Sequence, residues 1–236
     1  ASYGSKYCSW TFRKAPKFFD VVTYTGNFTA GKTVSHNLGS VPGMILIKDT
    51  SNTRNWIVYH RSIGEGKFLK LNLTDAEASN TFNFNNTAPT STQFTLGESS
   101  NTNTNGANYV AYLFAHNNSD GEFGPDSDAD IIKCGSYTGN TSGTEVNLGF
   151  EPQFVMIKKS TDSESWYVYD SMRGVVTGGG NSQDKKLRFN SSGAEGAVAS
   201  PIIAFSANGF ILESTDNEIN GSGTYIYMAI RRGPLA

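Results

Sequence analysis

The side chains in this sequence that could do chemistry are few and far apart. The three histidines are His36, His60 and His116, and none stands beside a second ligand at metal-site spacing. The patterns H-E-x-x-H, C-x-x-C and G-x-S-x-G, which indicate zinc, redox or serine chemistry, do not occur. Carboxylate pairs that cleave sugars assemble from distant strands, so a polysaccharide-degrading enzyme stays an alternative. The sequence favours a protein that is not an enzyme and uses no cofactor.

An acidic connector carries several aspartates between residues 117 and 130. Ca²⁺ takes several oxygen ligands from loops of this kind, and the candidates are Asp126, Asp128 and Asp130. Their spacing does not match an EF-hand loop, which needs a central Gly and a terminal Glu. A water-exposed linker is therefore the favoured interpretation, and no metal site is predicted.

Aromatic residues at Trp56, Tyr59, Trp166 and Tyr169 could bind a sugar, because aromatic faces stack on pyranose rings. A core role suits them too, since strand alternation places each Trp and its neighbouring Tyr on opposite faces. We favour the core for the tryptophans and leave the tyrosines open. The loops expected to contact a ligand are residues 60–67 and 171–185. The candidate ligand-binding residues are Tyr59, His60, Arg61, Tyr169, Asp170 and Arg173.

These residues belong to a sequence that repeats itself. Tyr24-Thr25-Gly26-Asn27 returns as Tyr137-Thr138-Gly139-Asn140, and residues 38–59 return without a gap as residues 148–169. Further on, Asn105-Gly106 pairs with Asn220-Gly221. A period of about a hundred residues is the size of a small domain and too long for a solenoid unit. The duplication predicts two tandem modules, residues 18–116 and 131–236, joined by the linker 117–130.

A third, partial copy stands near the first residue of the sequence. The segment Tyr7-Cys8-Ser9-Trp10-Thr11-Phe12-Arg13 resembles residues 109–115 and 225–231, which close the two modules. We interpret residues 1–17 as the closing strand of an upstream module followed by a connector. The alternative is strand addition, in which this segment completes a module of a neighbour or of its own chain.

Composition limits the possible partners. The 236 residues include 19 Lys and Arg and 21 Asp and Glu, a net charge of −2, without long blocks of either sign. Nucleic acid is not predicted as a partner, because phosphate binding needs a basic patch. No apolar stretch is long enough to span a bilayer, so membrane insertion is not expected. Cys8 and Cys134 align with apolar residues of the other copies, which predicts buried free thiols.

The pattern of apolar residues is typical of an all-β chain. Short runs rich in Val, Ile, Phe, Tyr and Thr are separated by Gly, Asn, Ser and Pro clusters. Residues 68–73 and 186–190 alternate apolar with polar side chains, as half-buried antiparallel strands do. Residues 44–47 and 154–157 are continuously apolar and predict central strands. We expect about eight or nine strands per module in two stacked sheets, an antiparallel β-sandwich of jelly-roll type.

The repeated elements also resemble a known group of modules. Tyr-Thr-Gly-Asn, Trp-x-Val-Tyr and the closing Tyr-Val-Ala-Tyr-Leu-Phe-Ala strand are similar to modules of tail fibres and other structural proteins of tailed bacteriophages, of the marine or cyanophage type. The resemblance covers nearly the whole chain, and its motifs are structural. It implies two tandem sandwich domains of jelly-roll shape, similar to concanavalin and laminin-G domains, in a virion component. The Gly-rich loop 177–181 departs from the first copy, so the two sets of loops need not share a function.

The expected function is that of a non-enzymatic virion protein. We expect a tail-fibre or appendage segment on the particle surface that contributes to host attachment, since tandem modules supply reach and multivalent binding. The implied partners are other virion proteins, a bacterial surface glycan and further copies of the chain, with a trimer as one option. A capsid decoration protein without a host ligand is the first alternative. A tailspike-type polysaccharide-degrading enzyme is the second.

Overall fold

The computed structural model describes residues 7–141, 143–175, 185–197, 202–213 and 217–233. Within them the chain consists of antiparallel strands, and the single helical element is a 3₁₀ turn, η1 (Ser171–Arg173). The all-β, antiparallel β-sandwich fold expected from the sequence is confirmed. Among these residues, no helix combines the length and apolar character needed to cross a membrane.

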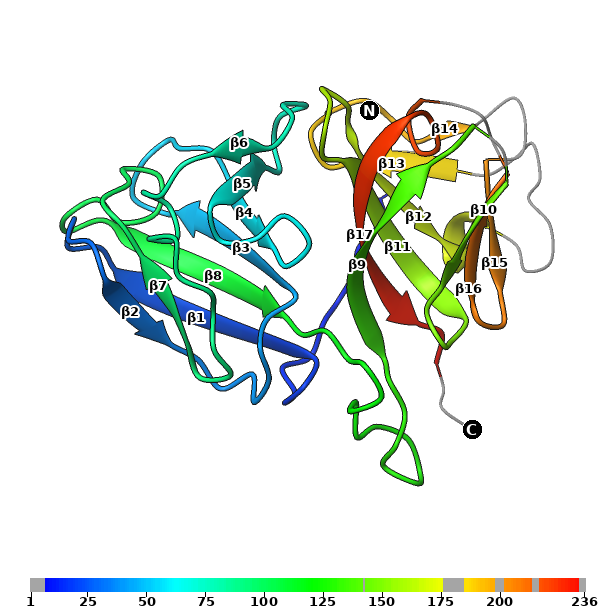
Figure 1. Cartoon of the computed structure of the whole chain (residues 1–236), viewed down its shortest axis with the longest axis horizontal. Helices are drawn as coiled ribbons and strands as arrows, with labels where there is room; N and C mark the ends of the chain where they lie inside the picture. Colours follow the sequence, from blue (N-terminus) through cyan, green and yellow to red (C-terminus); the bar gives the residue numbers. More distant parts are fainter. Residues whose placement is uncertain (1–6, 142, 176–184, 198–201, 214–216, 234–236) are drawn as a thin grey trace, which may run out of the picture.

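The first half of the chain forms two facing sheets (Figure 1), which we call module 1. The larger sheet has six strands and the smaller one has two. In spatial order the larger sheet contains β1 (Phe19–Thr25), β8 (Asn108–Phe114), β3 (Met44–Asp49), β4 (Ile57–His60), β5 (Lys67–Lys70) and β6 (Ala78–Ser79), and the smaller sheet pairs β2 (Lys32–Ser35) with β7 (Gln93–Leu96).

The second half, module 2, repeats this strand order. Its six-stranded sheet contains, in spatial order, β9 (Ile132–Gly139), β17 (Gly223–Arg231), β11 (Pro152–Lys159), β12 (Trp166–Asp170), β13 (Lys185–Arg188) and β14 (Gly196–Ala197). Its smaller sheet contains β10 (Thr144–Asn147), β16 (Gly209–Leu212) and the additional strand β15 (Ile203–Ser206). The predicted central strands are confirmed, because β3 and β11 each have a paired neighbour on both sides.

The repeated Tyr-Thr-Gly-Asn motif fastens the first strand of each module to its closing strand. The ring of the motif tyrosine stacks on the first tyrosine of the closing strand. The hydroxyl of the motif tyrosine donates to a backbone carbonyl in the turn that precedes the closing strand. A Cβ at Gly26 or Gly139 would lie 2.2 or 2.0 Å from a carbonyl oxygen of that turn, so only glycine fits. The stacked pairs are Tyr24–Tyr109, with ring centroids 5.1 Å apart, and Tyr137–Tyr225, at 5.0 Å.

The asparagine of the motif corrects one pairing expected from the sequence. The backbone N–H of Asn27 donates to Asn103 Oδ1, and that of Asn140 donates to Asn220 Oδ1. By this role, Asn220 is the counterpart of Asn103 and not of Asn105. A one-residue difference in the turn before the closing strand explains the shift, since β8 and β17 then align again at their tyrosines.

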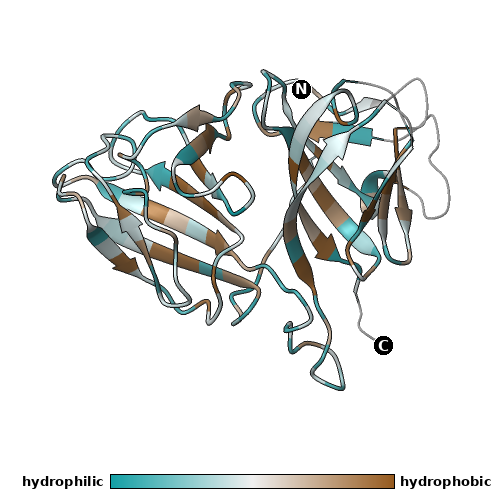
Figure 2. Cartoon of the chain, viewed as in Figure 1, coloured by the Kyte–Doolittle hydropathy of each residue, from teal (hydrophilic) through white to brown (hydrophobic). Residues whose placement is uncertain are grey.

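In both modules the apolar residues gather in the strands, and the hydrophilic ones are more frequent in the loops (Figure 2). One face of each six-stranded sheet packs on the small sheet of its own module, and the other face is turned toward the other module. One buried cluster lies inside module 2. The other extends from inside module 1 across the junction to Phe154, Met156, Ile226 and Met228 of module 2. One of the two buried clusters is therefore shared by both modules.

The N-terminal segment runs between the two modules and not along a sheet (Figure 1). Residues 7–14 are outside any strand, so the segment completes neither sheet of its own chain. Its interpretation as the closing strand of an upstream module stays a prediction, as do the domain boundaries. Cys134 is buried as expected, whereas the prediction of a buried Cys8 is wrong. Cys8 is exposed because its segment does not enter a sheet; both thiols are free.

Candidate functional site

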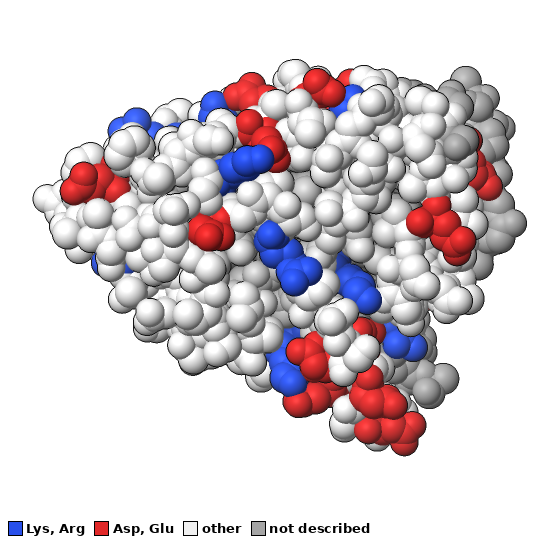
Figure 3. Space-filling view, in the orientation of Figure 1, with Lys and Arg blue, Asp and Glu red and all other residues white. Residues whose placement is uncertain are grey.

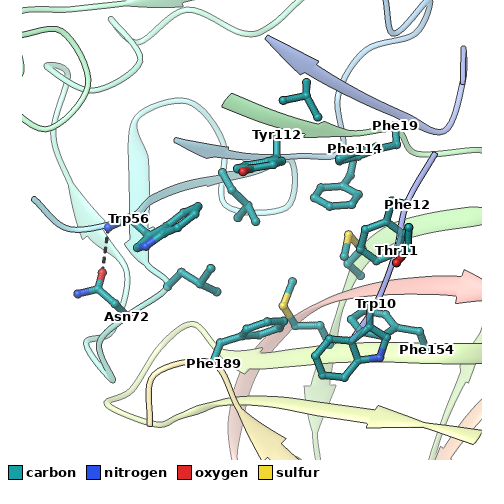
Figure 4. Close-up of a pocket in the computed structure, with 15 residues that line it drawn as sticks. Trp10, Thr11, Phe12, Phe19, Trp56, Asn72, Tyr112, Phe114, Phe154 and Phe189 are labelled. Carbon is teal, nitrogen blue, oxygen red and sulfur yellow. Dashed lines mark hydrogen bonds between the residues drawn. The ribbon is translucent and has the colours of Figure 1, made fainter. Parts of the chain in front are cut away.

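A large hollow lies between the facing sides of the two six-stranded sheets (Figure 4). It has a volume of 670 Å³ and is lined almost entirely by aromatic and aliphatic side chains. Module 1 contributes residues of β1, β3 and β8, module 2 contributes residues of β11 and β17, and the N-terminal segment forms a further wall. We call this hollow the aromatic cleft.

All three copies of the closing-strand motif meet at the aromatic cleft. Trp10 and Phe12 come from the N-terminal copy, Tyr112 and Phe114 from β8, and Met228 from β17. In sequence register Trp10, Tyr112 and Met228 occupy the same position of the motif. Alternation along β8 and β17 puts Tyr112 and Met228 on the cleft side of their sheets, and Trp10 reaches the same space from a segment outside any strand. The repeat therefore places equivalent side chains around one space.

Trp10 is the centre of this packing. Its ring meets Phe154 edge-on at 5.7 Å, and the guanidinium carbon of Arg173 lies 5.4 Å from its ring centroid. Its Nε1 donates a hydrogen bond to Asp170 Oδ2 at 3.2 Å. Phe12 meets the edge of Phe114 at 5.7 Å. The N-terminal segment is thus held by apolar contacts, a cation–π contact and one partly buried hydrogen bond.

The cleft offers little hydrogen bonding to a ligand. Its polar lining residues are Thr11 and Asn72. The amide of Asn72 is engaged on both sides, since Oδ1 accepts the backbone N–H of Trp56 at 2.9 Å and Nδ2 donates to Asn55 at 2.8 Å. The chemistry of this space is the burial of apolar groups.

Most of the predicted ligand-binding residues lie in the interior. Tyr59, His60, Tyr169 and Asp170 are all at most 4% exposed. Tyr59 packs against Phe84 within module 1. The expectation that these four side chains reach a ligand at the surface does not fit their burial. The reason is that β4 and β12 are covered on both faces, which alternation alone does not reveal.

His60 connects the modules. Its Nε2 lies 3.1 Å from the carbonyl oxygen of Tyr227 in module 2, and its Nδ1 accepts the backbone N–H of Ser62. These two bonds fix the neutral tautomer that carries its proton on Nε2. Burial lowers the pKa of His60 to about 4. His60 is therefore a neutral structural group at the junction.

Asp170 and Arg173 both contact Trp10 at one side of the cleft. Arg173 Nε donates to Asp170 Oδ2 at 2.6 Å, and the same carboxylate caps η1 by accepting the backbone N–H of Arg173. Both side chains are largely buried. Residues 176–184, which include the Gly-rich loop and most of the second predicted contact loop, lie outside the described residues.

Arg61 is the one predicted ligand-binding residue that is exposed among the six. It lines a smaller polar hollow of 350 Å³ together with Lys17, His116 and Asp120. Figure 3 shows basic side chains gathered at the junction of the modules, next to the acidic connector. Burial and the neighbouring Arg61 lower the pKa of His116 to about 4. Lys17 is paired with Glu122 and bonded to the Asp120 carbonyl, so Arg61 is the exposed cation of this hollow.

The acidic connector projects away from both modules (Figure 1). Asp126 and Asp128 are exposed, while Asp130 accepts the backbone N–H groups of Ser119 and Gly121 at 2.8 and 3.0 Å. The described part of the chain contains no group of three or more His, Cys, Asp or Glu side chains placed to hold a metal ion. The carboxylate of Asp130 stabilises the loop itself.

The two tryptophans of Trp-x-Val-Tyr differ in burial. Trp166 is buried, and its Nε1 donates to the carbonyl oxygen of Lys70 in module 1 at 2.9 Å. Trp56 is half-buried and lies nearly parallel to Tyr112 at the wall of the cleft. The core role favoured for the tryptophans is confirmed for Trp166. Both tryptophans face the other module, a placement that the sequence pattern did not predict.

The comparisons with known proteins give a family. The model of a domain of unknown function, DUF7483, matches residues 11–234. The chain belongs to the DUF7483 family. The match spans both modules and includes Thr11 and Phe12 of the N-terminal segment. No curated protein matches this DUF7483 chain. Among solved structures it is similar to the crystal structure of the STIV MCP, a viral major capsid protein, with 11% identity, a TM-score of 0.24, and coverage of 90% of this chain and 95% of that one.

Proposed function

We propose that this chain is a non-enzymatic structural component of a virion, a rigid two-module segment of a tail fibre or similar appendage. The observation that carries the proposal is the shared core: one buried cluster extends from module 1 into the module 2 sheet, and partly buried residues of the module 1 sheet and of the N-terminal segment pack against it. Domains joined by a small polar contact move relative to one another, whereas a large apolar contact suppresses that motion. Two modules held rigidly together suit a fibre segment, which must keep a fixed direction along its length.

The sequence resemblance to phage structural modules supports the same role. The repeated motifs that carry it are those that fasten strands, stack tyrosines and place glycines at close approaches. They act on the fold and not on a substrate. An array of such modules gains length with each copy, and its ends present different loops.

The proposal is tested on purified particles. Antibodies raised against the chain and carrying gold label are applied to virions from a host that encodes it, and the label is located by electron microscopy. Label along a fibre or appendage supports the proposal, and label over the shell favours capsid decoration. If neither labelling nor mass spectrometry detects the chain in purified particles, the virion role is overturned. A reducing-end assay on host polysaccharide that releases sugar would overturn the non-enzymatic part.

We propose, second, host attachment through an acidic surface glycan, which the polar hollow at Arg61 favours. Arg61 is exposed, as a contact with carboxylate or phosphate groups on a glycan needs. The variant Arg61→Ala is expected to reduce particle adsorption, while the exposed Arg54→Ala serves as a matched control. Equal adsorption of both variants and the parent would exclude this site. Light scattering of the purified chain would report whether it forms the trimer expected for a fibre.

A further inference from the structure

Lys159 is a buried cation whose amine contacts the side-chain amide of Asn217. It ends β11 with its side chain only 3% exposed, and its Nζ lies 5.8 Å from the ring centroid of Tyr225. The Nζ contacts Asn217 Oδ1 at 2.8 Å and Asp162 Oδ2 at 2.7 Å. A primary amine, a side-chain amide and a carboxylate are thus held together at the end of the strand.

The amide of Asn217 is held at both of its polar atoms. Its Oδ1 faces Lys159, and its Nδ2 donates to Glu164 Oε1 at 3.4 Å. Its backbone carbonyl accepts the hydroxyl of Tyr225 at 2.7 Å, which fixes the residue against β17. Asn217 itself is exposed. A group released from this amide has a direct path to solvent.

The arrangement fits the requirements of amide transfer. Lys159 Nζ lies beside the Asn217 amide, the Asp162 carboxylate is placed to accept a proton from that nitrogen, and Glu164 is placed beside the nitrogen that must leave. Groups held in contact in this way react at rates that free groups do not reach, because the entropy of bringing them together is already lost.

Module 1 lacks the reacting pair at the equivalent place. In the strand register, Asp49 of β3 lies opposite Tyr109 of β8, and Lys159 of β11 lies opposite Tyr225 of β17. Tyr109 donates its hydroxyl to the carbonyl of Ser100, the bond that Tyr225 makes to Asn217. Module 1 therefore has a carboxylate and a hydroxyl where module 2 has an amine and an amide. The same scaffold provides an internal negative control.

The geometry points to an intramolecular isopeptide bond between Lys159 and Asn217. The amine nitrogen of Lys159, after Asp162 takes its proton, attacks Cγ of Asn217 and forms the Nζ–Cγ bond. The Cγ–Nδ2 bond then breaks, and Nδ2 leaves with a proton relayed by Glu164. In sum, one ammonium side chain and one primary amide become one secondary amide and one ammonium ion. No oxidant, metal or other reactant is required.

The bond would join the end of β11 to the turn before β17, positions 58 residues apart in the sequence. It closes a loop at one end of the neighbouring strands β11 and β17. A covalent link of this kind restricts the unfolded chain as a disulfide does, and it is insensitive to reduction. The inference concerns the chain itself and does not depend on the proposed virion role.

The test is the intact mass of the purified, denatured chain after prolonged incubation at neutral pH. The expected result is a mass lower than that of the sequence by one ammonia, together with a branched peptide joining Lys159 to Asn217 after digestion. The Lys159→Arg variant, which keeps the cation, is expected at full mass. Lys158→Arg is the matched control and is expected to retain the loss. Glu164→Gln is expected to slow the loss.

The full sequence mass in the incubated parent chain, with Lys159 and Asn217 recovered on separate linear peptides, would overturn the inference. The same holds if Lys159→Arg loses ammonia as the parent does, since the loss would then come from another residue. Because the primary measurement uses the parent chain, the result does not depend on whether a variant folds.

Discussion

The cleft-facing sides of the two large sheets carry equivalent residues in different surroundings. On the module 1 sheet the residues at these positions are half-buried, whereas their counterparts on the module 2 sheet are buried. Lys48 Nζ is bound to the carbonyl of Arg54 at an exposed site. Its counterpart Lys158 is fully buried, and this burial lowers its pKa to about 8. The pairs concerned are Leu46 and Met156, Lys48 and Lys158, Val110 and Ile226, and Tyr112 and Met228.

The module 2 sheet is covered further by a segment of module 1. The segment around β5 and β6 of module 1 contributes three hydrogen bonds across the junction. Lys70 O accepts from Trp166, Glu77 N donates to Ser160 O, and Thr74 meets Ser163 through their hydroxyls. Two similar modules thus meet through two different surfaces. A contact of this head-to-tail type can be repeated along an array, whereas a two-fold contact closes on itself.

The largest expected effect is at the tryptophans. We expect Trp166→Ala to lower the free energy of unfolding by about 3–5 kcal/mol, because it empties a buried site and removes the hydrogen bond to the Lys70 carbonyl. Trp56→Ala, at the half-buried equivalent, should cost about 1–2 kcal/mol. Urea unfolding followed by circular dichroism measures both. Equal losses would contradict the asymmetry between the modules.

The next effect is a loss of stability in mild acid. The pKa of His60 is about 4 in the folded chain and about 6.5 when unfolded, so the unfolded state binds the proton more tightly. The contribution of His60 to stability is therefore complete above about pH 6.5 and falls by about 3 kcal/mol as the pH drops toward about 4.

Urea unfolding across this pH window measures the His60 effect. His60→Gln retains an N–H that can reach the Tyr227 carbonyl and does not titrate, so its stability should depend less steeply on pH. An unchanged slope in this variant would assign the acid sensitivity to other groups, such as His116.

A smaller effect is expected at the N-terminal segment. Phe12→Ala removes the edge contacts with Phe114 and Phe154 and enlarges the aromatic cleft, at a cost of about 2 kcal/mol for a half-buried ring. Phe28→Ala, at an exposed ring of module 1, is the matched control and should change stability by less than about 0.5 kcal/mol. If the shared core couples the modules, Phe12→Ala also broadens the unfolding transition. Identical curves for both variants would mean that the segment does not contribute to the junction.

The strands and the repeat were readable from the sequence because they follow from alternation and from local contacts. The stacked Tyr24 and Tyr137, and the continuous runs at β3 and β11, lie where their residue types indicate. The cleft was not readable from the sequence. A strand that alternates apolar and polar residues does not show whether its more polar face contacts water or another module. Trp10 gave one signal, its match to Tyr112, but that match indicated a strand. Contacts with residues far away in the sequence override such a local preference.

The smallest expected effect on stability compares the residues that follow the two Trp-x-Val-Tyr motifs. Arg61 of module 1 stands where module 2 has Ser171, and its side chain is exposed. Arg61→Ser should change the free energy of unfolding by less than about 0.5 kcal/mol, because a surface side chain remote from the core contributes little. Urea unfolding measures this, with Trp56→Ala as a reference of known sign. A loss above about 1 kcal/mol would place Arg61 in the junction and remove the basis for a ligand contact. A neutral result, combined with weaker adsorption of particles carrying the variant, would separate the role of this loop from that of the scaffold.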